Sequence, residues 1–545
     1  MKKRGIALAL SVVMILQMLT GCSLGKAKEG SENSIGNSGD GVLKLAVQAR
    51  GYGDEYLKQL AKAYEEKTGV KTSLVKSIAD GSALRAGLQA GEKNNDIDII
   101  FDIWPTAMGV LATANYVKGY ERAFLPISDI YDKVPEGYGT DKTLEELVMP
   151  YALRASTWGG KDAGFGDGEQ YFVCYATGME GLIYNVSLFE KYNLTEPKTT
   201  NEFFALMEKM KKLENGSYAK NAEGHDIYPY VYSGKANYSN YLATAWWAQY
   251  DGINNFNLAL EGKDASGNYT ANSVKAVGRL SAMTLVSKLL NQKSGYADTT
   301  NYSISFTDVQ LKFLDNQAFM MSTGDWIERE MEANFEGESL NIAFMRIPIN
   351  SDIILNCDSV TTEEQLVETI TYIDGETTTR PSYLSDADLA RIKEARSVYC
   401  SEGNQHIAYI PVYSDMAEEA KDFLLFMLSK EGQEIMTEYC YGNMAPMNVD
   451  VTQFRTYDSL SSLQLSKYEM VVSEVGLGLV GNNYSHPMAY VGGVQTFYNV
   501  PSFESAFGVV ETSSSFMTPE EMWKADYERM AANWSTNMQK AGVSN

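Results

Sequence analysis

Histidine and the sequence signatures of common enzymes are scarce in this chain. Its 545 residues include three histidines, His225, His406 and His486, which lie too far apart to match the spacing of a metal site. There is no His-Glu-x-x-His pair and no Gly-rich phosphate loop that ends in Lys-Ser/Thr. Carboxylates are numerous, but nothing marks two of them as a catalytic pair. We therefore expect no catalytic residues, no metal and no cofactor.

Basic residues are also in the minority, since the formal net charge is −24. Proteins that bind nucleic acid neutralise phosphates with clustered Lys and Arg, and this balance argues against such a partner. The charge keeps the protein soluble and away from anionic lipid. It does not predict a cationic ligand, because net charge describes a whole surface and a binding cleft is local.

Long apolar runs are absent apart from one near the start. Residues 6–18 follow Lys2, Lys3 and Arg4 and are too few to span a membrane comfortably, which is typical of a signal peptide. The run ends in Leu-Thr-Gly-Cys at Cys22, which resembles a bacterial lipobox, in which the thiol is lipidated and becomes the new N-terminus. The alternative is an ordinary signal peptide with a chance cysteine. We expect a leader at 1–21 and a lipid anchor at Cys22 on the outer face of the cytoplasmic membrane.

The segment that follows the leader, 22–41, is polar and rich in Gly and Ser, and it predicts a flexible tether. The other four cysteines are far apart, with no Cys-x-x-Cys spacing: Cys174, Cys357, Cys400 and Cys440. A Cys357–Cys400 disulfide is conceivable in an extracellular protein. Buried free thiols fit a body of this size at least as well.

The start of the body alternates strands and helices. The predicted elements are strands at 42–47, 70–75 and 96–102, a helix that contains Leu57, Leu60, Ala61 and Tyr64 and ends at Gly69, and a helix at 82–90. This rhythm is typical of a parallel sheet covered by helices on both faces. Ligands of such sheets bind outside the carboxyl ends of the strands, which selects the loops 48–53 and 102–106.

Several segments in order along the chain resemble family 1 extracellular solute-binding proteins. These are substrate-binding lipoproteins of carbohydrate ABC importers, of which maltodextrin-binding proteins are the best-known type. The segments are 63–71, 98–102, 181–185, 188–192, 197–203, 318–326, 420–427 and 521–534. Within 197–203, Thr199 and Glu202 also have the spacing of a helix capping box.

The resemblance implies a two-lobe α/β fold of the type II periplasmic-binding-protein kind, with a hinge between the lobes. The expected N-terminal lobe comprises 42–176 and 347–408, the expected C-terminal lobe 177–346 and 409–545, and the expected crossings lie near 175–180, 343–348 and 407–411. A long acidic and Thr-rich segment, 351–403, departs from smaller family members and reads as an insertion that contains a helix at 385–396.

The function that the resemblance implies is to bind a carbohydrate, an oligosaccharide by expectation, between the lobes. The closed protein, expected as a monomer, would then deliver it to the transmembrane subunits of an ABC permease. Two alternatives remain open at this point. One is a tethered enzyme acting on polysaccharide, and the other is a binder of the same fold for a non-sugar solute.

Aromatic and planar polar residues are the candidates for binding, because a pyranose stacks on rings while its hydroxyls need polar partners. Trp326 stands at the family's Gly-x-Trp position, where the resemblance implies stacking on sugar, and Asp325 precedes it. Asp102 and Trp104 follow a predicted strand, where a buried carboxylate would be costly without a role.

The other candidates have a structural reading of similar weight. Arg50 and Tyr52, on the loop after the first strand, bind ligand or face solvent. Trp158, in a Gly-rich loop, covers a ligand or shields a lobe edge. Trp246 and Trp247 are adjacent on a predicted helix, so only one of them faces a cleft easily, and we choose Trp246.

Overall fold

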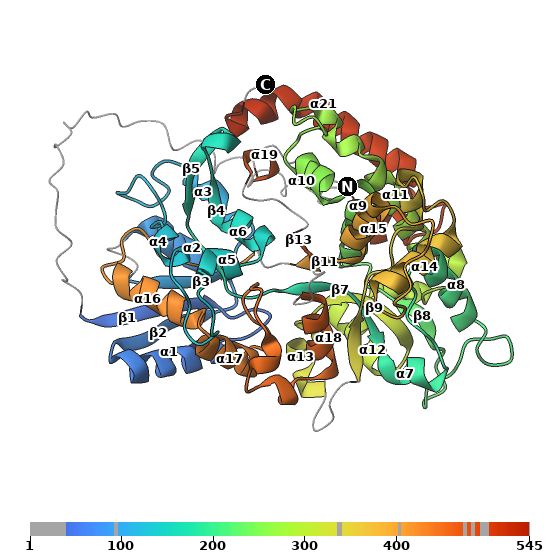
Figure 1. Ribbon diagram of the computed structural model, residues 1–545, viewed down its shortest axis with the longest axis horizontal. Coiled ribbons are helices and arrows are strands. Elements are labelled where there is room, and N and C mark those ends of the chain that lie inside the picture. Colours follow the sequence, from blue (N-terminus) through green and yellow to red (C-terminus); the bar gives the residue numbers. More distant parts are fainter. Residues whose placement is uncertain are drawn as a thin grey trace, which may run out of the picture. The chain divides into compact units, whose positions relative to one another are not determined.

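Strand β1 (Val42–Gln48) begins a five-stranded sheet that forms the centre of a first lobe (Figure 1). The computed structural model describes residues 40–91, 96–334, 341–401, 405–471, 477–480, 486–490 and 501–543, so the predicted leader and Cys22 lie outside the described residues. The order of the sheet is β2 (Lys71–Ile78), β1, β3 (Ile99–Ile103), β12 (His406–Tyr409) and β6 (Val173–Cys174). The first three strands are parallel, and β12 runs antiparallel to both of its neighbours. The predicted strands and both predicted helices, α1 (Glu55–Thr68) and α2 (Gly81–Ala90), are confirmed.

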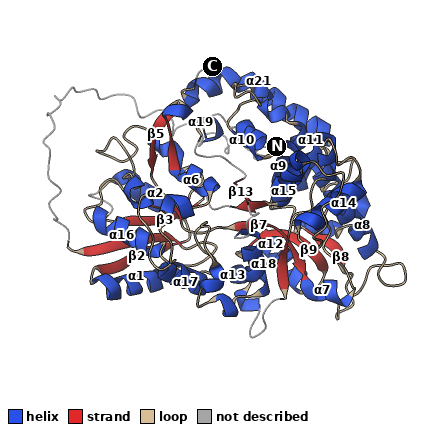
Figure 2. Cartoon of the chain, viewed as in Figure 1, coloured by secondary structure: helices blue, strands red, loops and turns tan. Residues whose placement is uncertain are grey.

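A second sheet forms the centre of a second lobe (Figure 2). Its order is β13 (Leu477–Val480), β11 (Val398–Ser401), β7 (Met179–Asn185), β9 (Ala318–Gly324) and β8 (Tyr228–Val231), and β10 (Ile342–Met345) also pairs with β7. Its helices include α7 (Val186–Lys191), α8 (Thr200–Met210), α9 (Ser239–Asp251), α10 (Ile253–Leu260), α11 (Val277–Leu290), α12 (Phe306–Leu314), α13 (Ile327–Glu330), α18 (Ser462–Val471), α20 (Phe503–Phe507) and α21 (Pro519–Ala541). Thr199 caps α8 by accepting the N–H of Glu202, as its spacing predicts. The two-lobe α/β fold is therefore confirmed.

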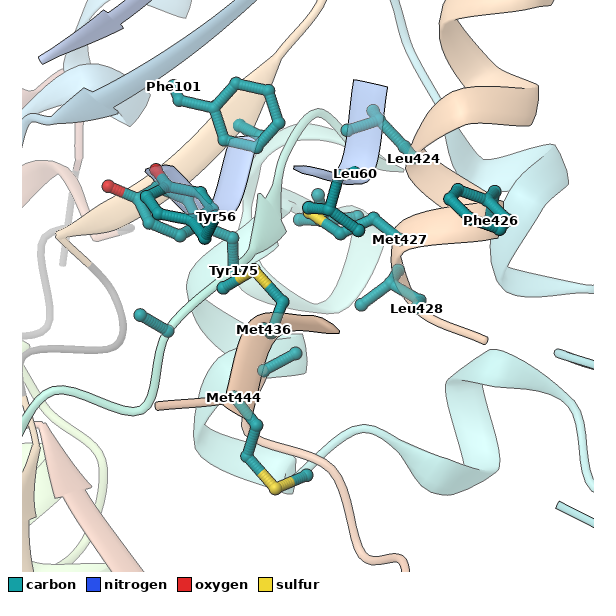
Figure 3. Close-up of a cluster of buried hydrophobic side chains, with 14 of the residues drawn as sticks. Tyr56, Leu60, Phe101, Tyr175, Leu424, Phe426, Met427, Leu428, Met436 and Met444 are labelled. Carbon is teal, nitrogen blue, oxygen red and sulfur yellow. The ribbon is translucent and has the colours of Figure 1, made fainter. Parts of the chain in front are cut away.

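The core of the first lobe is built from both ends of its sequence (Figure 3). Tyr56 and Leu60 of α1 face Phe101 of β3, and the ring of Tyr175 packs in parallel against Tyr56 at 6.0 Å. Two helices from much later in the chain, α16 (Ala417–Met427) and α17 (Lys430–Tyr439), lie beside α1 (Figure 1). Their apolar faces complete this core. The smaller elements of the lobe are α3 (Ala107–Leu111), α4 (Ser128–Tyr131), α5 (Leu144–Leu147), α6 (Pro150–Ser156) and the paired strands β4 (Thr157–Gly160) and β5 (Phe165–Gln170).

The lobe ranges in the structure differ from those predicted. Within the predicted insertion, α14 (Glu363–Ile373) and α15 (Asp386–Arg396) share a small apolar core of their own, and α15 packs on α9 of the second lobe. Strand β11 then pairs with β7, so most of 347–401 belongs to the second lobe rather than the first. Conversely, α16 and α17 place the start of 409–545 in the first lobe. Apolar stripes show which face of a helix is buried, but not which lobe buries it.

The described residues contain no helix with the length and apolar character of a membrane span. Cys174, Cys357, Cys400 and Cys440 are free thiols, so the conceivable Cys357–Cys400 bridge is not formed. Burial raises the pKa of each of these thiols. They are therefore poor nucleophiles at neutral pH.

A buried ion pair fastens the C-terminal helix to the second lobe. Arg279 of α11 donates to Asp526 of α21, and both side chains are about 1% exposed. Arg529 also donates to Asp526 at 2.6 Å. Burial alone would raise the pKa of Asp526, but the two guanidinium groups outweigh burial and lower it.

Asp526→Ala should therefore lower the free energy of unfolding by about 3–5 kcal/mol at neutral pH, because it leaves Arg279 buried without its counter-ion. Since the pKa of Asp526 is lowered in the folded protein, this contribution should be present above the ordinary carboxyl pKa of about 4 and should shrink as the pH falls below it. Urea unfolding at pH 7 and pH 3.5 measures both effects. Glu528→Ala, at an exposed position of the same helix, is the control, and an equal loss in both variants would contradict the expectation.

Candidate ligand-binding site

A cavity of about 620 Å³ lies between the two lobes. The first lobe contributes the loops after β1, β2 and β3 and the start of β12, as expected for the carboxyl ends of parallel strands. The second lobe contributes the starts of α9 and α12 and the segment after β9. The lining residues are Gln48, Arg50, Gly51, Tyr52, Ala79, Asp80, Gly81, Arg85, Ile103, Gln405 and His406 on one side and Tyr238, Tyr241, Phe306, Trp326 and Glu330 on the other.

The wall from the second lobe is aromatic. The rings of Tyr238 and Tyr241 are stacked with centroids 5.4 Å apart. Trp326 and Phe306 approach Tyr238 at 6.2 Å and 6.3 Å. Trp326 directly follows Asp325 after β9, and its side chain is 8% exposed, so part of the ring is left at the cavity. Such a wall offers flat apolar surface to a ligand.

The wall from the first lobe is polar and planar. Asp80 caps α2 by accepting the N–H of Ser82 at 2.9 Å, and this bond and the Ser82 hydroxyl lower the pKa of the Asp80 carboxyl. Gln48 donates to the carbonyl of Ala79 at 3.2 Å. Arg85, one turn into α2, completes this wall.

Asp102 lies behind this wall. Its side chain has no exposed surface, and its oxygens accept from Arg85 Nη1 at 2.9 Å, Tyr409 Oη at 3.2 Å and the N–H of Ile103 at 2.9 Å. Burial raises the pKa of Asp102, and Arg85 opposes part of that rise. The Arg85 guanidinium carbon lies over Trp104, 5.2 Å from the centre of the indole ring. Asp102 and Trp104 therefore support a lining residue.

A second buried carboxylate, Asp325, connects the lobes. Its Oδ1 accepts from the hydroxyl of Tyr52 on the first lobe at 2.6 Å. Its Oδ2 accepts from Lys467 of α18 at 3.1 Å, from Asn443 at 2.9 Å and from the N–H of Met179 at 3.3 Å. Asp325 therefore fixes the position of the cavity walls without lining the cavity itself.

Of the residues singled out from the sequence, the structure brings three to the cavity: Arg50, Tyr52 and Trp326. Asp102, Trp104 and Asp325 lie immediately behind it. Trp158 packs against Phe165 in the β4–β5 hairpin, with ring centroids 5.4 Å apart, and does not line the cavity. Trp246 is fully buried in the second lobe and donates to the carbonyl of Pro348 at 3.0 Å, so it adds nothing to the cavity surface.

The lining residues that sequence reasoning missed come from two sources. Asp80 and Arg85 follow β2, and the rule that ligands bind beyond strand ends applies to this loop as well. Tyr238, Tyr241 and Phe306 stand at helix starts, and no spacing in the sequence separates them from the many tyrosines and phenylalanines of the core. Within the described ranges, no cluster of three or more His, Cys, Asp or Glu residues could hold a metal ion.

Residues 59–463 match the family model described as bacterial extracellular solute-binding protein. The chain belongs to this family. Its members bind solutes and are not enzymes, which removes the alternative of a tethered polysaccharide-active enzyme. A comparison with curated protein sequences found no match.

Solved structures of the same fold include several sugar-binding proteins. RafE in complex with raffinose is 14% identical, with a TM-score of 0.51 over 90% of this chain and 99% of that one. AcbH, described as having an exclusive preference for β-D-galactopyranose, is 14% identical, with a TM-score of 0.55 over 92% and 99%. A chitin oligosaccharide binding protein is 17% identical, with a TM-score of 0.54 over 90% and 98%. At these identities the likeness concerns the fold.

The contact between Tyr52 and Asp325 in this solute-binding protein can be tested by removing one oxygen. Tyr52→Phe leaves Oδ1 of a buried carboxylate without the donor that reaches it across the lobes, and it should lower the free energy of unfolding by about 1–3 kcal/mol. Urea unfolding measures the change. Tyr302→Phe, at a position that is 37% exposed, serves as the control. A loss no larger than that of the control would show that the cross-lobe bond adds no stability.

Proposed function

We propose that this extracellular solute-binding protein binds a carbohydrate, an oligosaccharide, in the cavity between its lobes and delivers it to the transmembrane subunits of an ABC permease. The observation that carries the proposal is the pairing of two unlike walls across one cavity of about 620 Å³. Rings of Tyr238, Tyr241 and Trp326 face a wall of planar polar groups. A pyranose has the matching faces, since its C–H surface stacks on rings and its hydroxyls form hydrogen bonds at the edge.

The solved structures of the same fold support the carbohydrate class. These proteins are described as binding raffinose, galactopyranose and a chitin oligosaccharide, which differ in size and in sugar. The fold therefore accommodates sugars of several lengths, and the lining residues of each chain set the choice. In this chain the site residues that we propose for direct contact are Arg50, Tyr52, Arg85, Tyr238 and Trp326, with Asp102, Trp104 and Asp325 in support.

Isothermal titration calorimetry of the soluble body against a panel of oligosaccharides, polyamines, peptides and chelated metals tests this function. Trp326→Ala should weaken binding of the sugar that is found by about 10-fold or more, because it removes stacking area from the aromatic wall. Trp534→Ala is the matched control, since Trp534 is a half-buried residue of α21 in a separate cluster.

Two outcomes would contradict the proposal. Binding of a polyamine, peptide or chelate with no response to any sugar would assign this chain to a non-sugar solute. Equal sugar affinity in Trp326→Ala and Trp534→Ala would remove the aromatic wall from the site. In both cases membership of the solute-binding family would stand.

We also propose that Cys22 carries a lipid anchor and that 22–41 is the tether that keeps the lobes near the permease at high effective concentration. In cells, Cys22→Ser should abolish incorporation of an alkyne-labelled fatty acid and move the protein from the membrane fraction to the medium. Cys357→Ser, which changes a free thiol in the body, should leave both readouts unchanged. Membrane retention and labelling of Cys22→Ser would contradict the anchor.

A further inference from the structure

Asp102 and Trp104 hold Arg85 in the cavity wall and leave most N–H groups of its guanidinium available for other hydrogen bonds. One nitrogen, Nη1, donates to Asp102 at 2.9 Å, and the guanidinium carbon lies over the ring of Trp104, 5.2 Å from its centroid. Asp102 is itself held in place, because it has no exposed surface and also accepts from Tyr409 and from the N–H of Ile103. A guanidinium fixed by stacking and by one hydrogen bond is oriented in advance for a ligand.

The close packing at Gly81 shows how tightly this arrangement is built. A Cβ at Gly81 would lie 2.6 Å from Arg85 Nη1, 2.3 Å from Gln48 Oε1 and 2.9 Å from Asp102 Oδ1. The absence of a side chain at the first residue of α2 therefore lets Arg85 lie against the helix start. The Arg85 side chain is 25% exposed, and the exposed part lines the cavity.

Two guanidinium groups at the cavity keep N–H groups for a ligand. Among the described residues, no group of the protein accepts from the remaining N–H groups of Arg85 or from those of Arg50, which is exposed at the same cavity. Two carboxylates, Asp80 and Glu330, line the same cavity, interact electrostatically with Arg85 and Arg50, and keep some acceptor capacity. Asp80 accepts twice from Ser82, and Glu330 accepts from Gln310 at 2.9 Å.

A guanidinium with free N–H groups binds a ligand that supplies acceptors. A sugar hydroxyl can accept from it, but the hydroxyl is neutral and offers a single oxygen. A carboxylate only accepts, and its two oxygens match the planar N–H groups of a guanidinium in charge-assisted, two-point hydrogen bonds. The net charge of −24 does not oppose this locally, because charges beyond about 8 Å are screened at physiological salt.

We propose that the ligand is an acidic sugar, an oligosaccharide with uronic acid units, and that Arg85 binds its carboxylate with Arg50 as a second contact. This inference rests on the proposed carbohydrate function and narrows it to one substrate class. Asp102 and Trp104 act as positioning residues, since they orient Arg85 and do not touch the ligand.

Matched ligand pairs test the inference. Oligogalacturonates, oligoglucuronates and oligomannuronates of two and three units are each titrated beside the neutral oligosaccharide obtained by reducing their carboxyl groups. The wild-type protein should bind one acidic member at least about 10-fold more tightly than its reduced partner. Arg85→Gln should weaken binding of that acidic member by about 10- to 100-fold and abolish the preference, with a clearly smaller loss for the reduced partner.

Two variants sharpen the result. Arg85→Lys keeps the charge but loses the planar fork, and it should restore only part of the preference. Arg380→Gln removes a partly exposed arginine outside the cavity and should change neither affinity. The thermal unfolding midpoint of each variant confirms folding, and the comparison of ligands in the wild-type protein needs no variant.

The outcomes separate this inference from the proposed function. Equal or tighter binding of the reduced partner would overturn the acidic-sugar inference and leave the carbohydrate function standing. An equal loss for both members of a pair in Arg85→Gln would also overturn it, because Arg85 would then be a contact to hydroxyls. Binding of no sugar by the wild-type protein would contradict the carbohydrate function and this inference together.

Discussion

The buried carboxylate of Asp325 is the contact on which the arrangement of the two lobes depends. It directly follows strand β9 and accepts from Lys467, Asn443, Tyr52 and the N–H of Met179, which reach it from four separate parts of the chain. Without such partners a carboxylate buried away from water would cost several kcal/mol. The backbone that follows Asp325 carries Trp326. The hydrogen bonds and the ion pair of Asp325 therefore fix the position of Trp326 in the aromatic wall.

The two walls of the cavity arise from different features of the fold. Polar side chains gather on the first lobe because its parallel strands end together, and backbone groups there are available to caps such as Asp80. The aromatic wall arises where helices of the second lobe begin, at Tyr238 and Phe306. The two walls are complementary, since the first is mainly polar and the second mainly aromatic. Under the proposed function, a sugar held by both walls would couple binding to closure of the lobes.

The sequence supports much of the fold but only a minority of the cavity lining, and the limits have physical causes. The strand-end rule identified Arg50 and Tyr52, because the end of the first predicted strand can be read from the sequence. Trp326 came from a family resemblance. Tyr238 and Tyr241 could not be found in this way, since their neighbour Trp246 on the same helix is in the core and spacing does not reveal which residues face a cavity. The lobe assignment of 351–401 and of α16 and α17 depended on pairings and packing between segments far apart in sequence.

Asp102 illustrates the difference between placing a residue and knowing its role. The sequence located it at the end of a strand, and a carboxylate there was expected to accept from ligand hydroxyls. The structure keeps it next to the cavity but turns its oxygens to Arg85, Tyr409 and the backbone of Ile103. The group at the cavity surface is then the Arg85 guanidinium, a donor held by a buried anion, where an acceptor was expected at Asp102. The difference is due to Arg85, which lies on α2, seventeen positions before Asp102. Only the three-dimensional arrangement brings Arg85 and Asp102 together.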